Sequence, residues 1–452
     1  MTFGLAAAAE VDSGNTAWVL ASAALVLLMT PGLAFFYGGM VRGKHVLGML
    51  MQNFITMAVV GVLWVVGVYS LAFGGGSGWL GDLRQVGLAH MQEPVAGYVG
   101  PLAQSIPPLV FVAFQLMFAI ITPALITGAS ADRLRFAGFV VFVAVWVTVV
   151  YAPVAHWVFS PVGWLFALGA EDFAGGTVVH ANAGAAGLAL VLVLGRRLGW
   201  PGERMRPHNL PLVMLGAGLL WFGWFGFNAG SALGANELAG YAFVNTNTAT
   251  GAAVLGWLLV ERLRDGRPTT LGAASGAVAG LVAITPACGF VSPLGAIVVG
   301  AVAGVVCCLA VGLKYRLGFD DALDVVAVHL VGGVSGALLI GLLGTSAVGG
   351  ADGLFYGGGW SLLGKQAVAV GVVVGYSFGV TLVLAKLIDL TVGLRVSAEA
   401  EYEGLDASQH AESGYDFSGL GASTPSVPAG GNTAGQPAGH SAGHAPKTEV
   451  SQ

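Results

Sequence analysis

Long apolar stretches separated by short polar segments recur from residue 17 to residue 387. A helix needs about 20 residues to cross about 30 Å of hydrocarbon, and eleven stretches come close to that length or exceed it. They are residues 17–40, 46–73, 104–129, 136–159, 177–195, 210–229, 239–261, 270–287, 293–313, 326–345 and 363–387. The pattern predicts an all-α polytopic membrane protein with eleven transmembrane helices.

The basic residues test this number of spans independently. Lys and Arg gather in the cytoplasmic loops of membrane proteins, so they should fall in alternate loops if every span is real. Sixteen of the eighteen basic residues fall on one side, which leaves only Arg84 and Lys365 for the other. This topology places residues 1–16 outside the cell and the C-terminus in the cytoplasm. The first residues have no basic stretch, which disfavours a cleaved signal peptide.

Composition agrees with a membrane location. Hydrophobic residues make up 56% of the 452 residues and charged residues 9%, whereas soluble domains carry about 25% charged residues. Many of the 72 glycines lie in apolar stretches, where small residues let membrane helices pack closely. The net charge of −5, without a basic stripe, argues against nucleic-acid binding. Cys288, Cys307 and Cys308 lack the spacing of a metal site and are interpreted as packing residues.

The segment after the last span divides into two parts. Residues 388–417 have a mixed charge pattern, which by itself indicates a solvated cytoplasmic segment. Residues 418–452 are rich in Gly, Ala, Ser, Pro and His and have almost no large apolar side chains. Such a composition cannot offset the entropy cost of ordering, so this tail is expected to be disordered. The transmembrane domain is therefore residues 17–387.

A short motif occurs twice, five spans apart. The pattern H-x3-G-x2-G begins at His180 in the fifth span and at His329 in the tenth span. An odd offset reverses the direction in which the chain crosses the membrane. The repeat therefore predicts two inverted halves of five helices each, with the eleventh helix outside the repeat and the site at the interface of the halves.

The two histidines are the main candidates for chemistry. An ionisable side chain inside a span is costly unless it meets a cavity or a partner. If His180 and His329 face each other, their imidazoles can relay a proton or hold a small polar molecule. Two alternatives stay open: each histidine bonds a backbone carbonyl separately, or the two ligate a haem. The small flanking residues and the absence of a Cys-rich cluster disfavour the haem, and no cofactor is expected.

Aromatic residues cluster at the end of the sixth span and within the third. Trp224, Phe227 and Ser231 lie three and four residues apart and share one helical face. Such a face can hold a small cation by cation–π attraction and a hydrogen bond, although an interfacial aromatic belt would have the same composition. Phe114 and Phe118 are also four residues apart, and core packing alone could account for them.

Asp172 lies eight residues before His180, near the start of the fifth span. Its carboxylate can satisfy the free N–H groups of that helix as a cap. In a pore it would also stabilise a cation indirectly by fixing nearby backbone carbonyls. The two roles are compatible.

With these features in place, the chain resembles the ammonium transporter (Amt/MEP/Rh) family, in its bacterial Amt branch, over residues 16–417. The resemblance is carried by DFAGGTVVHANAG at 172–184, WFGFNAGS at 224–231, AFVNTNTAT at 242–250, ITPACGFVSP at 284–293 and DLTVGLRVSAEAEYEGLD at 389–406. Several long motifs in the same order make the resemblance specific.

The resemblance implies a homotrimer in the cell (inner) membrane, with one pore in each subunit, and a cytoplasmic PII-type regulator that docks on the inner loops and on residues 389–417. It implies twin pore histidines, a phenyl gate, an acidic residue near the entrance and an outer ammonium site. By motif these are His180 and His329, Phe118 and Phe227, Asp172, and Phe114, Phe159, Ser231 and Trp224, respectively. Phe159 replaces the Trp that is usual in the family, which weakens cation–π attraction.

The implied mechanism recruits ammonium at the outer site, removes a proton and passes ammonia along the histidines. The rival hypothesis is an ammonium sensor that signals to the PII-type partner and transports little. The intact histidine pair favours transport. No nucleophile, base and orienting group occur together within the spans, so an enzyme is not indicated.

Overall fold

A computed structural model describes residues 10–203 and 205–415, and the regular secondary structure of the described part is helical apart from three isolated β-bridges. The α-helices are α1 Ser13–Met40, α2 Val46–Leu63, α3 Tyr69–Phe73, α4 Pro108–Ser130, α5 Phe136–Trp146, α6 Ala152–Phe159, α7 Trp164–Leu168, α8 Asn182–Leu194, α9 Leu210–Gly230, α10 Glu237–Arg264, α11 Thr270–Ile284, α12 Pro293–Ala310, α13 Leu313–Leu317, α14 Val331–Leu343, α15 Ser361–Thr391, α16 Ala398–Glu403 and α17 Leu405–His410. Four π-helical turns continue these helices: η2 Trp64–Val68, η5 Val147–Tyr151, η6 Gly176–Ala181 and η7 Val326–Leu330. Four short 3₁₀ turns are η1 Gly43–His45, η3 Val86–Leu88, η4 Gly100–Leu102 and η8 Leu354–Tyr356.

All eleven predicted spans are helical in the described part of the chain. Nine of them are long and apolar enough to cross a membrane. The other two are α10, whose sequence is less apolar, and α11, which has 15 residues. The first span begins at Ser13 rather than at residue 17, and the third at Pro108 rather than at residue 104. The predicted all-α membrane fold is confirmed, while the predicted disordered tail, residues 418–452, lies entirely outside the described residues.

Polar side chains fix where several spans begin. Asp12, Asn209, Asn236, Thr269 and Ser292 each accept a hydrogen bond from the backbone N–H three residues later. These caps satisfy donors that the first turn of a helix leaves unpaired. An unpaired donor is especially costly next to hydrocarbon, so the caps define the ends of the membrane-spanning bundle.

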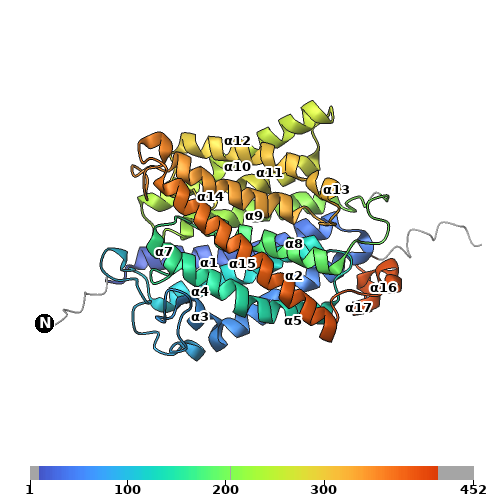
Figure 1. Cartoon of the computed structure of the whole chain (residues 1–452), viewed down its shortest axis with the longest axis horizontal. Coiled ribbons are helices and arrows are strands. Elements are labelled where there is room, and N and C mark those ends of the chain that lie inside the picture. Colours follow the sequence, from blue (N-terminus) through green and yellow to red (C-terminus); the bar gives the residue numbers. More distant parts are fainter. Residues whose placement is uncertain (1–9, 204, 416–452) are drawn as a thin grey trace, which may run out of the picture. The chain divides into compact units, whose positions relative to one another are not determined.

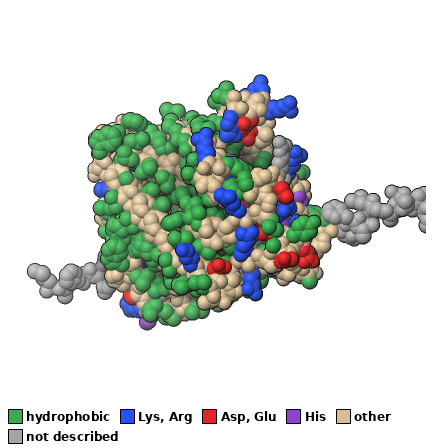
Figure 2. Space-filling view, turned by 45° about the vertical axis from the view of Figure 1, so that its right-hand side comes forward, with side chains coloured by type: hydrophobic (Ala, Val, Ile, Leu, Met, Phe, Trp, Pro, Cys, Tyr) green, Lys and Arg blue, Asp and Glu red, His purple; other side chains and the backbone are tan. Residues whose placement is uncertain are grey.

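The long helices lie side by side, and α15 crosses obliquely over its neighbours (Figure 1). The short helix α7 lies at one end of the bundle and α16 at the other, and we call these ends the α7 face and the α16 face. Apolar side chains cover the flank of the bundle, whereas Lys and Arg gather towards the α16 face (Figure 2). This separation is what a lipid-embedded bundle with one basic face requires.

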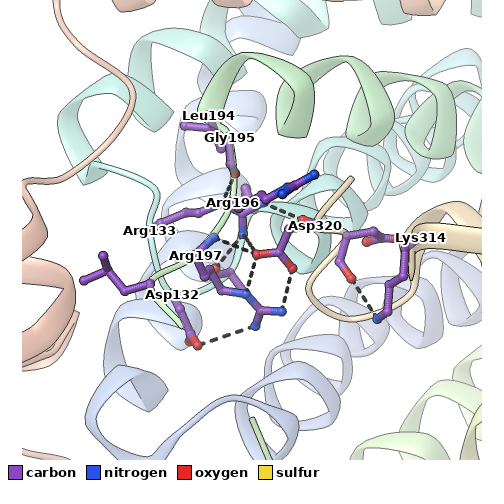
Figure 3. A network of polar contacts seen from close by, with 12 residues as sticks. Asp132, Arg133, Leu194, Gly195, Arg196, Arg197, Lys314 and Asp320 are labelled. Carbon is purple, nitrogen blue, oxygen red and sulfur yellow. Dashed lines mark hydrogen bonds and ion pairs between the residues drawn. The ribbon is translucent and has the colours of Figure 1, made fainter. Parts of the chain in front are cut away.

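A buried ion-pair network ties the loops together at the α16 face (Figure 3). Asp320 accepts two hydrogen bonds from the Arg197 guanidinium, at 2.8 and 2.9 Å. Arg133, fully buried, donates to the backbone carbonyls of Gly195 and Asp320. Asp132 lies 3.6 Å from Arg197. Arg133 and Arg197, two of the basic residues that the positive-inside rule places on one side, are therefore structural partners of these buried carboxylates.

The segment after α15 packs against the same face. Glu401 of α16 accepts from the Leu198 backbone N–H at 2.6 Å and pairs with Arg395 at 2.9 Å. In α17, the Asp406 carboxylate accepts from the Gly48 N–H at 2.8 Å. Residues up to Gly414 belong to the same compact unit as the membrane bundle. The start of the predicted C-terminal segment is thus bound to the loops rather than solvated throughout.

The network gives a stability prediction. Burial alone would raise the pKa of Asp320, but the hydrogen bonds and charge of Arg197, with Arg133, outweigh it and hold the pKa below its ordinary value. The carboxylate is therefore ionised at neutral pH. Asp320→Asn should destabilise the protein by about 3–5 kcal/mol, because it leaves buried guanidinium groups uncompensated. Thermal unfolding in detergent measures this change.

Asp265→Asn is the matched control, because Asp265 and Arg264 form a solvent-exposed pair with about half of each side chain accessible. Such pairs contribute little, so its melting temperature should stay at the native value. An equal fall of the melting temperature in the two variants would contradict a special role for the buried network.

Candidate functional site

The two histidines lie in matching π-helical turns. His180 lies in η6 and His329 in η7. Ahead of η6, the Asp172 carboxylate accepts from the N–H groups of Gly175, Gly176 and Thr177 at 2.7–2.8 Å. Asp172 stands eight residues before His180, and a second carboxylate, Asp321, stands eight residues before His329.

The second carboxylate, Asp321, accepts from the N–H groups of Val325 and Val326 at 3.1 and 2.7 Å. Sequence reasoning assigned Asp172 but missed Asp321. The repeated D-x7-H spacing was the signal that could have found it. The two turns are therefore capped in the same way, as expected for the two halves of the predicted inverted repeat.

Glycines let the two histidine turns approach each other. Each glycine stands four residues after its histidine and packs against the opposite turn. A Cβ on Gly184 would lie 2.4 Å from the backbone nitrogen of Leu330, and one on Gly333 would lie 2.9 Å from that of Ala181. Real Cβ atoms do not come this close, so only glycine fits at either position. The H-x3-G motif therefore encodes the crossing of the two halves.

This crossing brings the imidazoles into contact. The Nδ1 atoms of His180 and His329 lie 3.3 Å apart, and the rings are 5.4 Å apart and inclined by 24°. Both side chains are buried. One Nδ1 must donate a proton to the other, because two bare or two protonated nitrogens could not bond. The Nε2 atom of His180 is buried without a hydrogen-bond partner among the described residues.

Direct contact also decides between the geometries that the sequence left open. The histidines bond each other rather than separate carbonyls through Nδ1. Their contacting rings leave no space for a macrocycle between them. Among the described residues there is no group of three or more His, Cys, Asp or Glu side chains that could hold a metal ion.

Aromatic rings continue from the histidine pair towards the α7 face. Trp224 stacks on His180 at 5.4 Å, and Phe227 lies 6.0 Å from the same imidazole. The Trp224 indole donates to the Thr285 hydroxyl at 2.7 Å, which fixes its ring. Phe118 packs on Phe227 with centroids 4.3 Å apart. The two predicted gate residues thus pack against each other with their rings tilted by 40°, and Phe227 lies against His180.

The remaining predicted aromatic residues surround Phe118. Phe114 lies 4.9 Å from it and is fully buried, while Phe159 lies 6.3 Å from it at nearly a right angle. Of the predicted outer-site residues, Phe159 and Ser231 line the cavity at the α7 face, whereas Phe114 lies behind Phe118 and Trp224 lies deeper, against His180.

The cavity at the α7 face has a volume of about 490 Å³, and we call it the vestibule. Phe118 and Ser231 both line it. The Ser231 hydroxyl donates to the Phe227 carbonyl at 2.8 Å, so its oxygen lone pairs are left to accept from a ligand. Three further polar side chains that sequence reasoning did not assign as site residues also line it, Tyr98, Gln115 and Glu171.

Asp172 lies at the inner side of the vestibule. Burial raises the pKa of its carboxyl group, and the hydrogen bonds from Thr177 and the backbone N–H groups partly offset this effect. Both oxygens are occupied by these donors, including the Thr177 hydroxyl. The Asp172 carboxylate therefore fixes the backbone of the turn before His180 and has no oxygen without a donor.

A second set of cavities lies beyond the histidine pair, towards the α16 face. A small cavity of about 30 Å³ touches His329 and Tyr37. Another of about 400 Å³ shares Met40, Leu271, Leu323 and Asp324 with it. The histidine pair therefore lies between the vestibule and these cavities.

An apolar helix bundle with cavities on both sides of a buried polar pair defines a multi-pass membrane transport protein. The sequence profile of the Ammonium Transporter Family matches residues 17–415, and the chain belongs to that family. The predicted resemblance is thus confirmed.

Individual relatives agree. The ammonium transporter of Mycobacterium tuberculosis (strain H37Rv) is 57% identical over 433 residues, covering 90% of this chain and 91% of that protein. The crystal structure of Saccharomyces cerevisiae Mep2 matches with a TM-score of 0.81 at 36% identity, covering 86% of this chain and 89% of that chain. A sensor Amt protein matches with a TM-score of 0.81 at 30% identity, covering 88% and 98%.

The glycine crossing gives a test of the site's architecture. Gly333→Ala should destabilise the protein by about 1–3 kcal/mol, because the added methyl group forces the two turns apart. The melting temperature in detergent and the rate of ammonium transport should both fall.

Gly375→Ala is the control, because a Cβ there meets nothing within 4 Å. That variant should match the native protein or gain up to about 1 kcal/mol from helix propensity. A Gly333→Ala variant with native stability and transport would show that the close crossing is not required.

Proposed function

We propose that this chain passes ammonium across the plasma membrane by deprotonating it in the vestibule and conducting ammonia past His180 and His329. The observation that carries the proposal is the buried contact between the two imidazoles, with a cavity on either side. A bare cation cannot enter such a narrow, low-dielectric passage without a large desolvation cost, whereas a neutral molecule can.

Recruitment would take place at the base of the vestibule. Phe159 and Phe118 offer aromatic faces, and the Ser231 oxygen offers a hydrogen-bond acceptor. Phe114 supports Phe118 from behind. An ammonium ion can donate to Ser231, whereas potassium has no protons to donate, so the site favours ammonium over an ion of similar size. Asp172 would contribute its charge through the capped turn.

Passage would begin when the stacked Phe118 and Phe227 rings separate. Ammonia would then meet Trp224 and the imidazole of His180, whose Nε2 lacks a protein partner. His329 would pass it to the small cavity beyond. We therefore place Trp224 in the passage beside His180 and the outer ammonium site around Ser231.

The proposal extends to orientation and assembly. The α7 face would be external and the basic α16 face cytoplasmic, as the positive-inside rule requires. The protein would form a homotrimer in the cell membrane with one pore in each subunit. The loops of the α16 face and helices α16 and α17 would receive a PII-type regulator, since these helices contact the membrane bundle through Asp406 and Glu401.

A sensor role is the second candidate. It is favoured by the match to a sensor Amt protein at 30% identity. A sensor would need the vestibule but not a conducting histidine pair. The two functions therefore separate in a flux experiment.

The test uses purified protein in liposomes on a solid-supported membrane. An ammonium pulse should give a transient current if the released proton crosses together with the ammonia, and otherwise a rise of pH inside the liposomes without a current. In His180→Asp the introduced carboxylate favours bare cations in the passage, so selectivity for ammonium over potassium should fall by roughly tenfold or more. His90→Asn is the control: His90 lies on an exposed loop with φ +61°, which Asn tolerates.

The two signals together decide between transport and sensing. Absence of current with a rise of pH inside the liposomes, read by a dye, would indicate electroneutral ammonia passage. Absence of both signals would contradict transport and favour the sensor.

A further inference from the structure

Glu171 is a vestibule residue for which the proposed mechanism has no use. It lies in the link between α7 and η6, directly before Asp172, and its side chain lines the vestibule. Gln366 of α15 fixes its backbone on both sides, accepting from the Glu171 N–H and donating to its carbonyl at 2.7 Å each. Its position in the cavity wall is therefore set by the fold.

The two oxygens of the Glu171 carboxylate differ in their surroundings. Oε1 accepts from the Ala351 backbone N–H at 2.7 Å. Oε2 is buried and has no hydrogen-bond partner among the described residues. A buried acceptor without a donor is costly, and since Glu171 lines the cavity, a small rotation of its side chain would bring Oε2 to a donor that enters the cavity. Ammonium is such a donor.

The charged groups around Glu171 are few. Lys365 on α15 acts on it electrostatically without forming an ion pair within 4 Å. Asp172, its neighbour in sequence, has both oxygens engaged by its own turn. Asp352, next to Ala351 in the loop, is bound by Ser346 at 2.7 and 3.0 Å. Glu171 is thus the vestibule carboxylate with an oxygen left for a ligand.

We propose that Glu171 is a second recruiting carboxylate of the vestibule, which draws ammonium towards Oε2 and releases this hold when it becomes protonated. The inference rests on the proposed function and adds a specific residue and a pH dependence to it. Ammonium approaching Ser231 would first meet Glu171, and acidification of the vestibule side would weaken its recruitment.

The pH range follows from the environment of the carboxyl group. Burial raises the pKa of Glu171 to about 7, although the Ala351 N–H and Lys365 oppose the shift. The carboxylate is charged above this pH and neutral below it. Ammonium stays protonated throughout this range, so a change in apparent affinity reports on the protein rather than on the substrate.

The experiment measures the apparent KM and the maximal ammonium-triggered current in liposomes, with equal pH on both sides, between pH 6 and pH 8. In the native protein the KM should rise roughly three- to tenfold from pH 8 to pH 6. In Glu171→Gln it should stay near the pH 6 value throughout. The maximal current should be similar in both proteins at each pH, because the amide keeps the acceptor for Ala351.

Two further variants test whether the pH dependence comes from the Glu171 carboxylate. Glu237→Gln removes an exposed carboxylate at the first turn of α10, at the same face, and should keep the native pH dependence. Lys365→Gln removes the cation that opposes protonation of Glu171, so the rise in KM should begin at higher pH. A purely structural role for Glu171 would not produce this shift.

The outcomes separate the inference from the function on which it rests. A Glu171→Gln variant whose KM follows pH as in the native protein overturns the inference while leaving ammonium transport in place. A native protein without ammonium flux at any pH overturns the proposed function, and the inference with it. A flat KM in Glu171→Gln together with the Lys365→Gln shift supports the inference.

Discussion

The close crossing of two helical turns is the constraint on which the site depends. Gly184 and Gly333 remove the Cβ atoms that would hold the turns apart, and the backbones meet where the histidines project. A contact between Nδ1 atoms at 3.3 Å needs both turns to be placed within a few tenths of an ångström. The rest of the bundle serves to hold this crossing in place.

The capping carboxylates and the cavities follow from the same arrangement. Each π-helical turn has N–H groups that its own helix leaves unpaired, and Asp172 and Asp321 accept from them. The inverted repeat places one carboxylate towards each side of the histidine pair. Carboxylates thus lie on both sides of the buried histidine pair, an arrangement that suits the proposed passage of a substrate that is a cation outside and a neutral molecule within.

Much of this arrangement could be predicted from the sequence. The spans followed from hydropathy, and the relation between His180 and His329 followed from a repeated motif, because glycine at a helix crossing is a strong local requirement. The vestibule was harder to predict from the sequence, since Glu171 and Tyr98 reach it from loops. The path of the Glu171 loop depends on tertiary contacts such as that with Gln366. Trp224 and Ser231 share a helical face, as predicted, but lie at different depths of the passage.

The central claim is that the two imidazoles act as one unit. A double-mutant cycle tests it most directly, comparing ammonium flux into liposomes for the native protein, His180→Ala, His329→Ala and the double variant. The account predicts that each single change removes most of the flux and that the second change adds little, because either one breaks the pair. Independent, multiplicative losses, or near-native flux in both single variants, would contradict it.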